Sequence, residues 1–305
     1  MSSAGRLDLS IPENIGTAFI GFLIGSVLFG IVTFQTYRYF RQYPDDPKIR
    51  KVYALSVFIL HLIYFVFSAT VMYTSIVNST QAGNRRFSWA VKATQIAKTI
   101  MMLWVQGFYI RLIWIVSQNL LVDGKEMKVI RGMTGLIFGY AIVIGGAYLA
   151  YMIEVSKLFM TNSGHMQFII YVAHASIAVI DCTIAGVLSY ILYKTMGQNE
   201  DSKILNKSRT TAVIRYLSYQ FIATAMLTGL TTITTVSLYV AKPSSAVCLA
   251  IDFSVPGLYA NAVLNLLNAK KRLSEKMKGT IDVKVSDALF LDNFPKSSAD
   301  EVPAQ

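Results

Sequence analysis

The stretch "LYANAVLNLLNAKKRL", Leu258 to Leu273, joins an apolar run to three asparagines and three consecutive cations. Apolar residues continue upstream of it, so that the run covers residues 247–268. A helix needs about 20 mostly apolar residues to cross a hydrocarbon core roughly 30 Å thick. The run therefore predicts a membrane-spanning helix, which leaves the bilayer at Lys270-Lys271-Arg272 because cations mark the cytoplasmic end of such helices.

Six more segments of this kind lie upstream. The full set is 15–37, 53–77, 94–116, 133–153, 168–192, 216–239 and 247–268. Together the seven segments hold four charges, which are Lys98, Arg111, Asp181 and Asp252. The whole chain of 305 residues is 15% charged, whereas soluble proteins are about 25% charged. Since backbone groups in lipid must pair within their own segment, we predict an all-α integral membrane bundle of seven transmembrane helices.

The charges between the segments predict the orientation of the bundle. The stretches 38–52, 117–132, 193–215 and 269–286 carry 19 Lys and Arg residues, whereas 1–14, 78–93, 154–167 and 240–246 carry 6. Cytoplasmic loops collect these cations, so we expect the N-terminus outside and the C-terminus in the cytosol. The expected parts are a short extracytoplasmic N-terminus (1–14), the seven-helix domain (15–278) and a disordered cytosolic tail (279–305).

The basic inner loops indicate what the chain contacts. The net charge is +11 and its cations are dispersed at helix ends. This pattern favours anionic lipid head groups of the bilayer and a cytosolic partner, and not nucleic acid. We expect an integral protein of the plasma membrane or an endomembrane. Asn78-Ser79-Thr80 fits the glycosylation pattern on the predicted outer side, so Asn78 is a candidate acceptor.

Polar residues follow one side of five segments. Residues four and seven apart share a helix face, and Asn261, Asn265 and Asn268 have this spacing. The other rows are Gln220, Thr224, Thr228, Thr231 and Thr235; Gln95, Thr99 and Gln106; Tyr171, His174 and Asp181; and His61, Tyr64 and Ser68. Two interpretations stay open: hydrogen bonds within and between helices, or the walls of a polar cavity.

Asp181 favours the cavity, because a carboxylate within the membrane is a functional-site hypothesis by default. It costs about 2.5–3.5 kcal/mol at the bilayer centre. We therefore expect it to point into the bundle, within hydrogen-bond reach of a polar group on the third, sixth or seventh segment. His174 lies two turns earlier on the same face. The candidate intramembrane polar site comprises His61, Gln106, His174, Asp181, Thr228, Asn261 and Asn265.

The other three intramembrane charges are expected near the membrane boundaries. Lys98 and Arg111 can extend their side chains toward the outer and inner surfaces. Asp252 lies near the outer end of its segment, on the side opposite Asn261. Asp181→Leu is therefore expected to disturb the protein more than Asp252→Leu.

Small residues predict where helices approach each other closely. The pairs Gly21-x-x-x-Gly25 and Gly135-x-x-x-Gly139 have the spacing that allows close helix approach, for which we expect packing within the bundle, with a dimer face as the alternative.

Reactive groups are sparse. The sequence contains no recognisable carboxylate pair, metal-ligand cluster or nucleophile triad, and its three histidines have no ligand spacing. We therefore expect no catalytic residues, no metal and no cofactor, and we do not expect an enzyme.

Several blocks carry a resemblance to a known family. They are "QTYRYFRQYPDDPKIRK" (35–51), "VQGFYIRLIWIVSQN" (105–119), "AVIDCTIAGVLSYIL" (178–192), "VIRYL" (213–217) and "LYANAVLNLLNAKKRL" (258–273). With these blocks, spread over about 15–275, the chain resembles multi-pass membrane proteins of mushroom-forming fungi that are catalogued only as a domain of unknown function. The resemblance implies a seven-helix membrane domain with no assigned substrate. Positions that match the family pattern, without a role, are Gln106, Arg111, Asp181, Tyr259, Asn261 and Asn268.

Three functions remain open from the sequence. The first is a receptor-like or sensor bundle that binds a small molecule among the polar rows and meets a cytosolic partner at its inner loops. The second is a transporter or channel, in which Asp181 and His174 relay protons. The third is a non-catalytic membrane scaffold.

Overall fold

The computed structural model describes residues 11–44, 46–77, 85–120, 124–154, 163–198 and 247–277, with scattered positions between 223 and 238. The helices are α1 (Ile11–Gln42), α2 (Lys48–Val77), α3 (Arg85–Leu120), α4 (Gly124–Glu154), α5 (Ser163–Gln198) and α7 (Val247–Met277). The described positions between α5 and α7 are helical as well, and no described residue lies in a strand. The all-α prediction is confirmed for this part of the chain.

Five of the described helices contain a stretch that is long and apolar enough to cross a membrane. The stretches are Ile15–Gln42, Lys48–Val77, Trp89–Trp114, Lys128–Ala150 and Ala250–Ala269, and α5 adds a shorter one at Ala175–Ile191. These helices indicate a multi-pass membrane protein. The predicted segment 216–239 lies mostly outside the described residues, so the count of seven spans stays a prediction.

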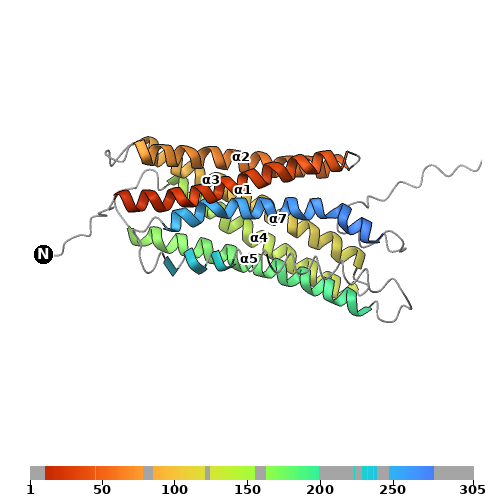
Figure 1. Cartoon of the computed structure of the whole chain (residues 1–305). Helices are drawn as coiled ribbons and strands as arrows, with labels where there is room; N and C mark the ends of the chain where they lie inside the picture. The colour runs from red at the N-terminus through yellow and green to blue at the C-terminus, as the bar shows by residue number, and fades with distance from the viewer. Residues whose placement is uncertain are drawn as a thin grey trace, which may run out of the picture.

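The helices pack along their lengths into an elongated bundle, as Figure 1 shows. α3 packs against α2, α4, α5 and α7, whereas α7 packs against α1, α2 and α3. In an apolar stretch of 18 residues, 61% of the residues are buried in α3 and in α7, whereas 11% are buried in α4. α3 and α7 are therefore the central helices of the described bundle, and the polar groups that they carry can meet partners on several neighbours.

Glycines bring α1 and α7 into close contact. A Cβ atom added to Gly21 would lie 2.3 Å from the Cα of Ala250, and one added to Gly25 would lie 2.7 Å from the carbonyl oxygen of Phe253. The packing predicted for this pair is confirmed, because only residues without a side chain let two backbones approach so closely.

For the second glycine pair, packing within the bundle is wrong, and the dimer-face alternative stays a prediction. Among the described atoms, none lies within 4 Å of a Cβ placed on Gly135 or Gly139. Both glycines are exposed on α4, the helix that presents most of its surface outward. Spacing alone shows that two glycines share a face, but it does not show that a neighbouring helix covers that face.

A short corner connects α1 to α2. Pro44 and Pro47 have no backbone N–H to continue a helix. The Tyr39 hydroxyl donates to Oδ2 of Asp46 at 2.9 Å, and the Arg50 guanidinium forms an ion pair with the same oxygen at 3.2 Å. These contacts hold the start of α2 against the end of α1.

Candidate functional site

Asp181 connects three helices. Nε2 of Gln106 on α3 donates to Oδ1 of Asp181 on α5 at 3.3 Å. The hydroxyl of Tyr259 on α7 donates to Oδ2 of the same carboxylate. Gln106 and Tyr259 are buried. The contacts expected for Asp181 with the third and seventh segments are therefore present.

A second polar cluster joins α3 and α7. It lies closer to the N-terminal ends of both helices than the contacts of Asp181 do. Nζ of Lys98 lies 2.7 Å from Oδ1 of Asp252, and Nε2 of Gln95 donates to Oδ2 of Asp252 at 3.3 Å. The hydroxyl of Tyr148 on α4 donates to Oε1 of Gln95 at 3.5 Å. The hydroxyl of Tyr64 on α2 donates to the backbone oxygen of Asp252 at 2.9 Å. Four helices thus meet around one ion pair.

The ion pair corrects the prediction for Lys98. This side chain does not extend toward the outer surface, because Lys98 is only 4% exposed. In a medium of low dielectric constant, a nearby opposite charge stabilises an ammonium strongly. Arg111, by contrast, is exposed, and its extension toward the inner surface stays a prediction.

A signal in the sequence could have identified the pair. Lys98 and Asp252 are opposite charges, and each lies about one turn inside the predicted outer end of its segment. Two of the four intramembrane charges are therefore predicted to lie at the same depth in the membrane.

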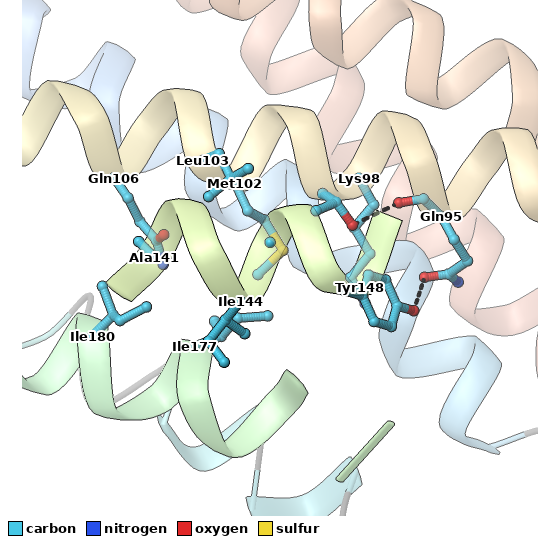
Figure 2. Close-up of a pocket in the computed structure, with 12 residues that line it drawn as sticks. Gln95, Lys98, Met102, Leu103, Gln106, Ala141, Ile144, Tyr148, Ile177 and Ile180 are labelled. Atoms are coloured by element: carbon cyan, nitrogen blue, oxygen red, sulfur yellow. Dashed lines mark hydrogen bonds between the residues drawn. The ribbon is translucent and has the colours of Figure 1, made fainter. Parts of the chain in front are cut away.

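A cavity of about 40 Å³ lies between α3, α4 and α5. Figure 2 shows Gln106 at one end and Gln95, Lys98 and Tyr148 at the other. Most of its wall is apolar: Ala141 and Ile180 lie near Gln106, and Met102, Leu103, Ile144 and Ile177 lie between the two ends. Since one water needs about 10–15 Å³ of such volume, the cavity has room for about three. Residues of both carboxylate clusters thus line one space.

His61 occupies a different place. It is 2% exposed, and its ring packs edge-on against Phe29 with centroids 5.5 Å apart. A Cβ on Gly257 would lie 3.5 Å from its Nε2. Its Nδ1 neither accepts nor donates a hydrogen bond among the described atoms. His61 therefore belongs to the α1–α2–α7 contact and does not line the α3–α4–α5 cavity.

Two asparagines of the row on α7 connect α7 to α1. Nδ2 of Asn261 donates to the backbone oxygens of Leu28 at 3.3 Å and Gly257 at 2.8 Å. Nδ2 of Asn268 donates to the backbone oxygen of Gln35 at 3.0 Å. The interpretation of hydrogen bonds between helices is confirmed for these two residues. Neither one lines the cavity.

Asn265 differs from its neighbours in the row. It is half-buried, and its side chain forms no hydrogen bond with the described residues. Threonines of the other rows bond to their own helices, as in Thr99 to the oxygen of Gln95 at 2.9 Å and Thr235 to that of Thr231 at 2.8 Å.

Three predicted residues lie outside the described part. Asn78 and Thr228 are not described, and His174 lies on α5 but its side chain is not described. Their roles stay predictions, as does ligand binding by the whole candidate set. Within the described ranges, no group of three or more His, Cys, Asp or Glu side chains is arranged to hold a metal ion.

Part of the chain is similar to a known family. Residues 177–272 match the model of a family of unknown function, DUF6534. The matched range contains Asp181, Asp252, Tyr259 and the asparagine row. No curated protein matches the chain.

Proposed function

We propose that the chain is a seven-helix membrane sensor that binds a small molecule in the α3–α4–α5 cavity. The cavity itself carries the proposal, because it combines an apolar wall with a polar group at each end. Ligand sites in proteins have this composition, in which a few placed polar groups orient a mostly apolar ligand. The proposed role is binding without catalysis and without a cofactor.

Contacts of α7 support transmission of binding to the cytosolic side. One end of the cavity is Lys98, which holds α7 through Asp252. Farther along α7, Asn268 bonds to α1. The hydroxyl of Tyr43, in the α1–α2 corner, donates to the backbone oxygen of Asn268 at 2.9 Å. A ligand that shifts α3 against α7 would therefore act on the corner beside the basic inner loops, where a cytosolic partner is proposed.

Helix directions support seven spans. Asn261 on α7 contacts Leu28 on α1, and seven residues later Asn268 contacts Gln35. Residue numbers therefore increase in the same direction along both helices, so α1 and α7 are parallel. α5 runs in the same direction as both (Figure 1). A return crossing between α5 and α7 is therefore proposed at the apolar segment 216–239. The cation distribution supports an outer N-terminus, and the resemblance to fungal seven-helix proteins supports the number of spans.

The proposed orientation predicts that protease added outside sealed cells leaves the tail after Gly279 intact. Opening the membrane with detergent should make the same tail accessible, which serves as the control. Cleavage of the tail in sealed cells would contradict the orientation.

Filling the cavity should abolish ligand binding. A compound that raises the thermal stability of the wild-type protein should lose its effect in Ala141→Leu, because Ala141 is buried in the cavity wall. A ligand at 100 times its Kd stabilises by about 2.7 kcal/mol, which a thermal unfolding scan in lipid nanodiscs detects.

Ala147→Leu is the matched control, because Ala147 is exposed on the same helix. This variant should keep the full ligand effect. If the ligand raises the thermal stability of the wild type, Ala141→Leu and Ala147→Leu equally, it binds outside the cavity. A broad ligand screen in which no compound changes the thermal stability would count against the sensor.

One observation favours a transporter or channel as the second candidate. Gln106 bonds to the Asp181 carboxylate and also lines a cavity with room for water, so a proton could pass between water and the carboxylate. His174 would be the next group in this relay. Proton flux in liposomes that continues unchanged in Asp181→Asn would exclude this candidate. A protein with neither ligand nor flux would be a scaffold.

A further inference from the structure

Lys98 has hydrogen-bonding capacity that the described structure does not use. An ammonium carries three N–H donors. Within the described residues, the Lys98 ammonium donates one hydrogen bond, to Oδ1 of Asp252 at 2.7 Å. Lys98 is 4% exposed and lines the cavity, so bulk water does not serve the remaining donors. A buried donor without an acceptor is unfavourable. The Lys98 end of the cavity therefore favours an occupant that brings an acceptor atom.

The charge of Lys98 is already balanced. The Asp252 carboxylate forms an ion pair with the Lys98 ammonium. Asp252 itself does not line the cavity. A ligand carboxylate would add a second negative charge beside Asp252, and a ligand ammonium would face Lys98. Both would carry a net charge into a region of low dielectric constant, which is costly. A neutral ligand avoids this cost.

The rest of the wall selects an apolar body. Met102, Leu103 and Ile144 lie between the polar ends (Figure 2). The volume of about 40 Å³ restricts the ligand to a few heavy atoms. Met102 can change its rotamer at low cost, which enlarges the space modestly.

From these three observations we infer that the ligand of the proposed sensor is a small neutral oxygen compound, such as a ketone, ester or alcohol. Its oxygen accepts a hydrogen bond from the Lys98 ammonium, and its hydrocarbon part lies against Met102, Leu103 and Ile144. This inference rests on the proposed function, since it names the chemical class that the same cavity takes.

Four probes of similar size test the inference: 2-butanone, n-pentane, butanoate and 1-butylamine. Each is titrated against the full chain in lipid nanodiscs, with thermal stability as the measurement. The Ala141→Leu variant is titrated in parallel, so that effects of probe dissolved in the lipid are subtracted. We expect 2-butanone to bind the wild-type cavity most tightly.

A double variant tests the role of Lys98 itself. Lys98→Met with Asp252→Leu removes both charges together and leaves neither one buried alone. In this variant the affinity for 2-butanone should fall by about tenfold, the equivalent of one hydrogen bond to a charged group. The affinity for n-pentane should change by less than about twofold, because its contacts are with the unchanged apolar wall.

The outcomes separate this inference from the proposed function. Equal affinity for 2-butanone and n-pentane, or tighter binding of butanoate or 1-butylamine, would overturn the ligand class and keep the sensor. A double variant that binds 2-butanone as the wild type does would also overturn it. If no probe and no compound of a broad screen gives an effect that depends on Ala141, both proposals fail together.

Discussion

Asp252→Leu is expected to destabilise the bundle by about 3–5 kcal/mol, because it removes one partner of a buried ion pair and leaves the other charged. Nζ of Lys98 lies 2.7 Å from the carboxylate, and Lys98 is 4% exposed. The substitution also removes the acceptor for Nε2 of Gln95. Unfolding by SDS in mixed micelles measures the loss of free energy.

The double variant Lys98→Met, Asp252→Leu is the matched control. It removes both charges and substitutes apolar side chains of similar length, so it should recover most of the lost stability. If Asp252→Leu is as stable as the wild type, the Lys98 ammonium is solvated in the folded protein. That result would contradict the burial of this side chain between α3 and α7.

Asp181→Leu is expected to cost about 1–3 kcal/mol for each buried donor that loses its acceptor. Buried donors that depend on this carboxylate include Nε2 of Gln106 and the hydroxyl of Tyr259. Removing the carboxylate also removes the cost of burying it, which offsets part of the loss. The same SDS unfolding experiment measures the effect.

Two variants calibrate that measurement. Asp181→Asn keeps one acceptor oxygen, so it should destabilise less than Asp181→Leu. Cys182→Leu changes the neighbouring residue, whose side chain is exposed, and should have little effect. If Asp181→Leu and Cys182→Leu are equally stable, the carboxylate does not hold α3, α5 and α7 together.

The structure changes the expected order of the two aspartates. From the sequence, Asp181 ranks above Asp252 because Asp252 lies near the membrane boundary. Depth in the membrane is only one determinant of the cost, since the partner matters as well. Asp252 neutralises a buried ammonium, and removing it leaves this charge without its counter-ion inside the bundle. Asp252→Leu is therefore expected to be the more damaging substitution.

The amino-acid sequence by itself determined the class of the fold. Apolar stretches of membrane-spanning length predicted the helices, because lipid offers no partner for backbone N–H and C=O groups. Helical spacing also showed that Asn261 and Asn268 share one face. The cost of an intramembrane carboxylate predicted that Asp181 would meet a polar group on the third, sixth or seventh segment. Each of these inferences depends on one helix and its solvent, so local sequence was sufficient.

Only the tertiary structure decided which faces meet. Spacing within a helix shows which residues lie together on its surface, but not how the helix is rotated about its axis relative to its neighbours. Asn261 and Asn268 therefore could have lined a cavity, and instead they bond to backbone oxygens of α1. Lys98 and Asp252 are 154 residues apart in the chain, and their ion pair depends on the side-by-side packing of α3 and α7. The cavity beside them depends on three helices at once, because its walls are the side chains that α3, α4 and α5 leave incompletely packed.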